Sequence, residues 1–235
     1  MVESYAEQTI LSLIIKLSFF KAAAFRAVIL GAPGSGKGTI SSRIVKAFGV
    51  THISTGDKLR ENALKSTELG KQVKKYINEG ILVPDETMIN IVTHEIETSN
   101  GANYLLDGFP RTLVQAEMLQ KQYPINFVLN LIVPHSVIIE RVKNRWVHLK
   151  SGRVYNIGFN DPKIPGKDDE TGESLSQRID DRPEIVAKRL NEYSAQVKPV
   201  IEYYKKLGIL KTFEGSSTDE LWPKIQKFIN QHIKS

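Results

Sequence analysis

The chain has 235 residues, of which 41% are hydrophobic and 25% are charged. These values are ordinary for a folded protein, and one domain with insertions is the simplest organisation for this length. Because the sequence contains no cysteine, it has neither a disulfide framework nor a thiolate metal site. The formal net charge of +6 at pH 7 leaves three kinds of partner open, namely nucleic acid, an anionic membrane and polyanionic small molecules.

The first 25 residues form a segment that we expect to lie outside the core domain. Residues 10–20 read ILSLIIKLSFF, an apolar run shorter than the roughly 20 residues of a membrane-spanning helix, so we expect no stable membrane insertion. Glu3 and Glu7 stand where a secretory signal or a mitochondrial presequence carries positive charge. Two interpretations stay open: an amphipathic extension with a targeting role, and a divergent or non-native leader.

The rest of the chain alternates short apolar runs with helical segments. The first run, residues 24–30 (AFRAVIL), leads into a glycine-rich loop and a helix that begins near Gly38 and closes at Gly49. Further strands are predicted at residues 104–106, 126–133 and 209–213. Helices are predicted at residues 85–97, 113–120, 136–143 and 183–206. This alternation predicts an α/β fold with a central parallel sheet flanked by helices.

Two stretches interrupt the alternation. Residues 54–83 are charged and helical, without a core strand, whereas residues 145–182 are rich in glycine, proline, aspartate and lysine, with a short β-like piece at 153–155. Long structureless loops are uncommon in a compact domain. We therefore expect both stretches to be small lobes that fold over a site, inserted into a core formed by residues 26–53, 84–144 and 183–235.

Residues 31–39 read GAPGSGKGT and carry the strongest chemical signal. A glycine-rich loop between a strand and a helix can wrap a phosphate chain, because its N–H groups and the helix start point at the anion. Lys37 can place positive charge on the β- and γ-phosphates. Gly38 replaces the usual serine or threonine and the hydroxyl follows at Thr39, so we expect Mg²⁺ to be held by nucleotide phosphates and water. The expected triphosphate contacts are Gly34, Ser35, Gly36, Lys37, Gly38 and Thr39.

Three further motifs make the pattern specific. GAPGSGKGT resembles the phosphate loop of the adenylate kinase family, and STGDKLR (54–60), EGILVP (79–84) and DGFPR (107–111) are similar to its other signatures. The resemblance runs from about Arg26 to the C-terminus and implies the P-loop nucleoside monophosphate kinase fold, with residues 54–83 as an AMP-binding lobe and 145–182 as a lid. The AMP contacts that it implies are Thr55, Arg60, Ile81, Leu82, Val83, Gly108, Phe109, Arg111, Gln115, Arg178 and Arg189.

Residues 107–115 make chemical sense on their own. Asp107 ends a strand close to the expected phosphate loop, so its carboxylate can organise water bound to Mg²⁺. Arg111 follows on a tight turn, and the fork of its guanidinium suits a phosphate. Gln115 lies one helical turn further on and can contact the edge of a base.

Arginines gather at both ends of the expected lid. Arg141 and Arg145 are four residues apart and share one helix face, while Arg178 and Arg189 flank the far end. Phosphoryl transfer needs in-line positioning, exclusion of water and positive charge, and we nominate no general base. The expected catalytic residues are Lys37, Asp107, Arg111, Arg145, Arg178 and Arg189. The resemblance adds Arg141, Tyr155, Asn156 and Thr218 as contacts of the donor nucleotide.

Some members of the family hold zinc in the lid with four cysteines. The matching positions here are His148, Ser151, Asp168 and Thr171. Because serine and threonine are poor zinc ligands, we expect no zinc and instead a hydrogen-bond network that holds the lid together.

Within the family, three stretches are more similar to the mitochondrial GTP:AMP phosphotransferase branch than to the general adenylate kinases. They are SGRVYNIGFN (151–160), Arg145 with Trp146, and LKTFEGSSTDELWPKI (210–225). This branch implies transfer from GTP or ITP to AMP, a monomer, and the mitochondrial matrix, with the cytoplasm as the alternative compartment. Arg178 is present where a weakly active branch carries a neutral residue, which favours an active enzyme.

Other functions were weighed against this one. An ATP:AMP adenylate kinase would use the same residues, whereas UMP/CMP and thymidylate kinases tend to have shorter lids. A regulatory GTPase would need an NKxD-like motif, which is absent, and a typical P-loop ATPase would carry glutamate where Gly108 follows Asp107. A nucleic-acid-binding module would show a clustered basic stripe with exposed aromatic residues, whereas these lysines are scattered. We expect nucleotides as ligands and no nucleic acid.

Overall fold

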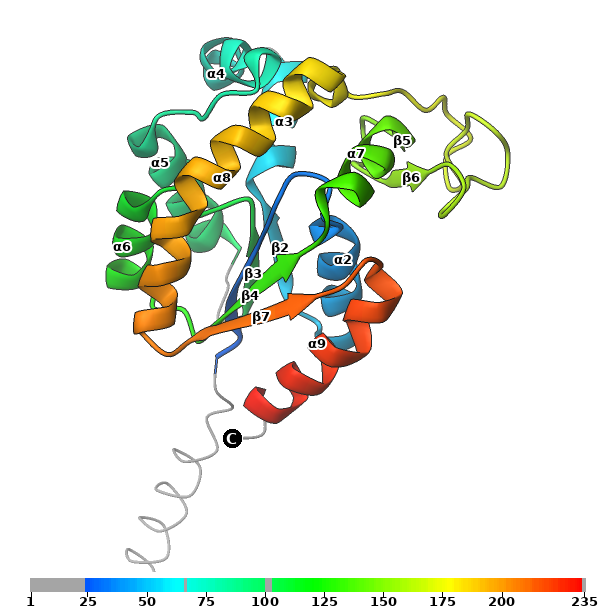
Figure 1. Cartoon of the computed structure of the whole chain (residues 1–235). Coiled ribbons are helices and arrows are strands. Elements are labelled where there is room, and N and C mark those ends of the chain that lie inside the picture. The colour runs from blue at the N-terminus through cyan, green and yellow to red at the C-terminus, as the bar shows by residue number, and fades with distance from the viewer. Residues whose placement is uncertain (1–23, 66, 100–102, 234–235) are drawn as a thin grey trace, which may run out of the picture.

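The computed structural model describes residues 24–65, 67–99 and 103–233, and these form an α/β fold (Figure 1). Five parallel strands lie in the order β2-β3-β1-β4-β7. Their bounds are β1 Arg26–Gly31, β2 Thr51–Ser54, β3 Tyr104–Asp107, β4 Phe127–Ile132 and β7 Leu210–Glu214. The predicted fold class is therefore confirmed. The N-terminal extension predicted at residues 1–25 lies, except for its last two residues, outside the described part.

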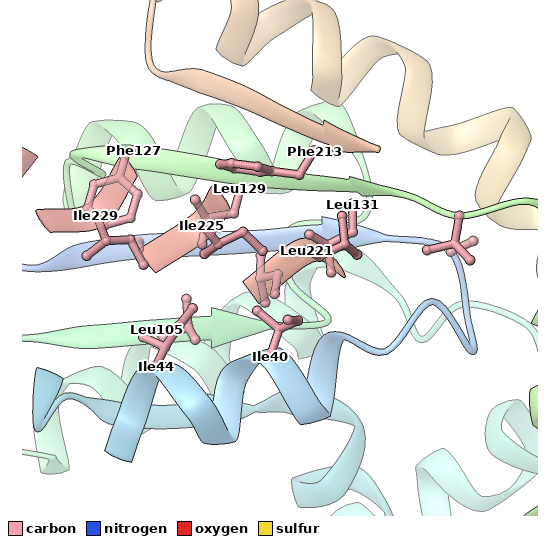
Figure 2. Packing of buried hydrophobic residues seen from close by; sticks show 14 of the residues in the cluster. Ile40, Ile44, Leu105, Phe127, Leu129, Leu131, Phe213, Leu221, Ile225 and Ile229 are labelled. Carbon is pink, nitrogen blue, oxygen red and sulfur yellow. The ribbon is translucent and has the colours of Figure 1, made fainter. Parts of the chain in front are cut away.

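Helices cover both faces of the sheet because the central strands are apolar on both sides. In β1, Ala27 and Ile29 belong to one hydrophobic core and Val28 and Leu30 to the other, as the two-residue period of a strand requires. The first core packs α2 (Lys37–Phe48) and α9 (Thr218–Ile233) against the sheet, as Figure 2 shows. The second packs α5 (Asp85–Thr98), α6 (Leu113–Gln122) and the C-terminal half of α8 (Pro183–Lys206).

Apart from Ser54, the last residue of β2, the two stretches that interrupt the alternation lie outside the five-stranded sheet. Residues 54–83 contain α3 (Thr55–Leu64) and α4 (Glu68–Glu79). Residues 145–182 contain a two-stranded antiparallel sheet of β5 (Arg145–Val147) and β6 (Val154–Asn156) and a 3₁₀ turn, η1 (Ile179–Asp181), and α7 (His135–Lys143) leads into them. In Figure 1 this second lobe projects beyond the carboxyl ends of the strands.

Strand register places the chemically important loops at one edge of the sheet. Ile29 pairs with Asp107, Asp107 with Ser54, and Gly31 with Leu131. The loops that leave β1, β2, β3, β4 and β7 therefore start side by side, at the edge where open α/β sheets bind ligands. No helix of the described residues is both long enough and apolar enough to cross a membrane.

Candidate active site

The loop after β1 is shaped by glycines that no other residue can replace without strain. Gly34 and Gly36 have φ angles of 81° and 89°, in the left-handed region that favours glycine. A Cβ at Gly34 would lie 2.6 Å from Val142 Cγ2, and one at Gly36 would lie 2.7 Å from Thr218 Cγ2. Gly36 is also the N-cap of α2, so the backbone N–H groups at the start of this helix border the loop.

Lys37 lies inside the curve of this loop. Its Nζ donates hydrogen bonds to the carbonyl oxygens of Gly31 at 2.8 Å and Ala32 at 2.9 Å. The pKa of Lys37 is lowered to about 8, chiefly by burial and also by the nearby Arg111 and Arg189, while Asp107 opposes the shift. A phosphate beside this ammonium group would favour its charged form.

One cavity of about 1190 Å³ collects most of the predicted site residues. Among the described residues, its lining includes eleven lysines and arginines but only six aspartates and glutamates. The predicted residues that line it are Gly34, Gly36, Lys37, Gly38, Thr39, Arg60, Leu82, Asp107, Gly108, Phe109, Arg111, Arg141, Arg145, Tyr155, Asn156, Arg178, Arg189 and Thr218. The excess of cations makes the cavity complementary to several phosphate groups.

Five predicted residues do not line the cavity, namely Ser35, Thr55, Ile81, Val83 and Gln115. Ser35, Thr55, Val83 and Gln115 are buried. Both ends of the Gln115 amide are engaged, since Oε1 accepts from the backbone N–H of Arg111 at 2.7 Å and Nε2 donates to Asp85 Oδ1 at 2.7 Å. A contact of Gln115 with a base edge stays a prediction, and its role in the structure is to fix the turn that carries Arg111.

Three aspartates that the sequence analysis did not single out hold the arginines in place. Asp181 forms a two-pronged ion pair with Arg145, whose Nε lies 2.7 Å from Asp181 Oδ2. Asp180 pairs with Arg189 at 2.7 Å, and Asp57 with Arg60 at 2.5 Å. The first two contacts join η1 to β5 and to α8, whereas the third lies within α3. Asp57 also lies 3.6 Å from Arg178 Nη2, which links α3 to the far end of the lid. No spacing rule could have found the Arg145–Asp181 pair, since its members are 36 residues apart.

Burial, and after it the closeness of like charges, shifts the pKa values of the arginines in this cavity. Burial lowers the pKa of Arg111 to about 10, with Arg189 and Arg60 adding to the effect, although Arg111 is open to the cavity. Burial, followed by Arg60 and Arg145, lowers the pKa of Arg178 to about 9. Burial opposes ionisation of Asp180, but the surrounding arginines, Arg189 foremost, hold its pKa below the ordinary value. The arginines of this group are charged at neutral pH, and additional anions would stabilise them together.

Asp107 lies at the end of β3 with two polar neighbours. His52 Nε2 and Ser41 Oγ each lie 3.4 Å from its Oδ2. Asp107 is 8% exposed and lines the cavity, so its carboxylate is accessible from the phosphate loop. This single carboxylate can hold water around a divalent cation but does not form a cage for one.

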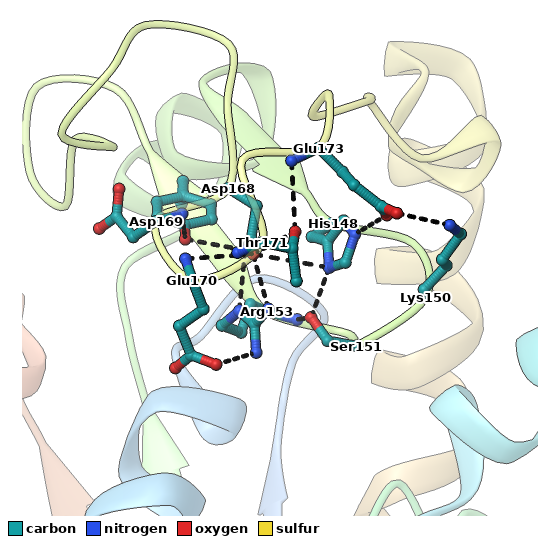
Figure 3. Close-up of polar contacts among 10 residues, drawn as sticks. His148, Lys150, Ser151, Arg153, Asp168, Asp169, Glu170, Thr171 and Glu173 are labelled. Carbon is teal, nitrogen blue, oxygen red and sulfur yellow. Dashed lines mark hydrogen bonds and ion pairs between the residues drawn. The ribbon is translucent and has the colours of Figure 1, made fainter.

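The lid contains the hydrogen-bond network that the sequence analysis predicted (Figure 3). His148 Nδ1 lies 2.8 Å from Ser151 Oγ, and Thr171 Oγ1 donates to Asp168 Oδ2 at 2.8 Å. Arg153 extends the network, since its Nε and Nη2 donate to the two oxygens of Asp168 at 2.8 and 2.6 Å. The hydrogen bonds from Arg153, and then those from Thr171 and Tyr155, hold the pKa of Asp168 far below its ordinary value.

The far side of His148 is also engaged, because its Nε2 lies 2.7 Å from Glu173 Oε2, which belongs to a carboxylate paired with Lys150. Within residues 24–65, 67–99 and 103–233, no group of three or more His, Asp or Glu side chains is arranged to hold a metal ion. Tyr155 is tied into the same network, since its hydroxyl donates to Asp168 Oδ1 at 2.9 Å. The lid is therefore joined by side-chain polar contacts around Asp168.

Comparison with known proteins agrees with this geometry. The sequence matches the adenylate kinase family over residues 29–209. It is 56% identical to a protein of Drosophila melanogaster named GTP:AMP phosphotransferase, mitochondrial, over 90% of this chain and 98% of that protein. A protein of Saccharomyces cerevisiae with the same name is 44% identical over 87% of this chain and 92% of its own length. A protein of Vanderwaltozyma polyspora named adenylate kinase is 42% identical over 88% of this chain and 96% of its own length.

The family match spans most of the chain and includes the loop at residues 31–39, the turn at residues 107–111 and the arginines of the cavity. These are the segments that the parallel sheet brings to one edge. This chain belongs to the adenylate kinase family.

Proposed function

We propose that this protein transfers the γ-phosphoryl group of GTP, or of ITP, to AMP, giving GDP and ADP. The observation that carries the proposal is a cavity lined both by the phosphate loop and by arginines from α3, α7, α8 and the turn after β3. The named mitochondrial relatives support GTP as donor and AMP as acceptor.

The arrangement supports in-line transfer between two bound nucleotides. Lys37 and the N–H groups of the phosphate loop hold the donor phosphates, and Arg60 and Arg111 hold the phosphate of AMP. Arg145 and Arg178 belong to the lid and Arg189 to α8. All three line the cavity, where they can neutralise the charge of the phosphoryl group in transit. The lobes at residues 54–83 and 145–182 exclude water when they close over the nucleotides.

Mg²⁺ fits this site as a companion of the nucleotide. One carboxylate, that of Asp107, faces the cavity beside the phosphate loop, and it would hold water around a cation whose other ligands are phosphate oxygens. Bound in this way, Mg²⁺ would neutralise charge on the donor phosphates. The lid network around Asp168 leaves no role for zinc in this proposal.

We further propose that the protein works as a monomer in the mitochondrial matrix. The compartment is supported by the names of the Drosophila and Saccharomyces relatives. Fractionation of cells with a matrix marker, followed by detection of the chain, tests the location, and co-fractionation with cytoplasmic markers would overturn it.

ATP as donor is a second candidate, because the Vanderwaltozyma relative is named adenylate kinase. The deciding experiment measures transfer to AMP with Mg²⁺ and GTP, ITP or ATP at matched concentrations, with ADP quantified by chromatography. UMP and CMP as acceptors provide the control for AMP specificity. A kcat/KM for GTP at least tenfold above that for ATP supports the proposal. The reverse preference overturns the donor, and no transfer from any donor overturns the function.

A further inference from the structure

Residues 216–219, which lead from β7 into α9, lie against the phosphate loop. Thr218 is 2% exposed and lines the cavity, and its Cγ2 lies against Gly36 of the phosphate loop. Arg141 approaches the same point, since a Cβ at Gly36 would lie 3.4 Å from Arg141 Nη1. Both side chains therefore meet at one turn of the loop that is expected to hold the donor phosphates.

Two buried polar atoms at this place have no hydrogen-bond partner among the described residues. They are Thr218 Oγ1 and Arg141 Nη1. The other guanidinium nitrogen, Arg141 Nη2, donates to the carbonyl oxygen of Ser216 at 2.8 Å, and Asn156 donates to the backbone carbonyl of Arg141 at 2.7 Å. Since a buried polar group without a partner costs free energy, both atoms are suited to receive hydrogen-bonding groups of a ligand.

A second arginine, on a different helix, holds the same segment. Arg43 lies on α2, the helix that starts at Lys37, and its Nη1 donates to the carbonyl oxygen of Thr218 at 3.3 Å. Its Nη2 forms an ion pair with Asp219. The Arg43 side chain is 32% exposed, and both Arg43 and Asp219 line the cavity. Residues 216–219 are thus contacted both by Arg141 from α7 and by Arg43 from α2.

We propose that Arg43, through its contacts with Thr218 and Asp219, is a positioning residue for the donor nucleotide. It fastens the start of α9 to the helix of the phosphate loop, so that Thr218 Oγ1 and Arg141 Nη1 are held at the distance from the loop that the donor requires. This inference rests on the proposed function in taking this end of the cavity as the donor site. The AMP contacts Arg60 and Arg111 lie on other elements, α3 and the turn after β3, so they are independent of it.

The test compares Arg43→Leu with Lys46→Leu, a control that removes an exposed cation from the same helix. Equilibrium binding of a fluorescent GDP analogue is measured without catalysis, beside the KM values for GTP and AMP and the melting temperature. Arg43→Leu is expected to raise the Kd for the analogue and the KM for GTP by roughly three- to tenfold. The KM for AMP is expected to stay within about twofold of the unmodified protein, and Lys46→Leu to change neither.

Further variants separate positioning from folding. Arg43→Lys keeps the charge but not the fork that reaches two acceptors, so it should recover only part of the affinity. Asp219→Asn should weaken GDP binding in the same direction, and the double variant should be no worse than Arg43→Leu alone. Equal losses for GTP and AMP, or a fall in melting temperature with unchanged GDP binding, would overturn the inference. If the unmodified protein binds GDP but transfers nothing, the proposed function fails while the binding data still decide the role of Arg43.

Discussion

Replacement of Lys37 by methionine is the most direct test of the phosphate loop. Methionine keeps most of the length and apolar bulk of the lysine but has no charge. The loss of one positioned charge at the phosphoryl group corresponds to about 3–4 kcal/mol of transition-state stabilisation. At 1.36 kcal/mol for each factor of ten, kcat should fall by roughly 10²- to 10³-fold.

The fold should survive this change because two effects oppose each other. Lys37→Met removes two hydrogen bonds, to Gly31 and Ala32, each contributing about 1.5–3 kcal/mol when the donor is charged. It also removes an ammonium group whose pKa is lowered from 10.5 to about 8, so that the folded state disfavours its charge by about 3 kcal/mol. The free energy of unfolding should therefore change by no more than about 3 kcal/mol.

The pH dependence provides an internal check. The pKa of Lys37 in the folded protein, about 8, lies below its value in the unfolded chain. The stability cost is therefore fully present below pH 8 and is relieved as the pH rises from about 8 towards 10.5. The affinity for the donor should change with pH in the opposite direction to the stability. Because donor binding requires the charged lysine, the affinity should fall above about pH 8.

The assay is single-turnover transfer from GTP to AMP, with melting curves for both proteins and GDP binding between pH 6.5 and 9.5. In Lys37→Met, turnover should be lost. The affinity for GDP should no longer fall above pH 8, because the variant has no ammonium group to deprotonate. Turnover within tenfold of the unmodified protein, or an identical pH profile in both proteins, would refute the assignment of Lys37 to the donor phosphates.

Two further outcomes follow from the site. Arg111→Ala should raise the KM for AMP by at least about tenfold, because a charged hydrogen-bond donor to the AMP phosphate is lost. Steady-state kinetics with GTP at saturation measures this KM. An unchanged KM for AMP would reject the role of Arg111 in AMP binding. Asp168→Asn should lower the melting temperature and increase proteolysis within the lid, because Arg153 and Thr171 lose a charged acceptor. The depressed pKa of Asp168 contributes stability above about pH 4 that is lost as the pH falls below that value, so the difference between Asp168→Asn and the unmodified protein should shrink in acid.

Most elements of the sheet could be predicted because they are apolar runs next to glycine or proline. The helix predicted at residues 183–206 has the same bounds as α8, which begins with Pro183 at its first turn. Strand β2, Thr51–Ser54, was not identified, since its four residues include one exposed threonine and a histidine. Its strand character comes from pairing with β3 at the edge of the sheet, which no local pattern reveals.

Helix α9 was also missed as an element, although its sequence contributed to the resemblance. Its buried residues Leu221, Ile225 and Ile229 recur every four positions, which is a helical period. Pro223 lies inside the helix, where a proline removes one backbone hydrogen-bond donor and argues against a helix in a sequence pattern.

The residues of the candidate site also differ in whether a local sequence pattern could reveal them. Lys37, Asp107 and Arg111 could be proposed from the sequence because each lies inside a short motif. Asp181 and Arg43 could not, because their partners are far away in the chain and only the folded structure brings them together.

Because the cavity has an excess of cations, the stability of the folded protein should depend on the concentration of bound nucleotides. Nucleotides that bind the folded state alone stabilise it by about 2.7 kcal/mol at a hundred times their Kd. A well-supplied compartment would therefore keep the chain folded and resistant to proteases. Depletion of nucleotides would restore the repulsion among Arg60, Arg111, Arg178 and Arg189 and loosen the segments that carry them. The abundance of the protein would then follow the supply of the nucleotides that it consumes.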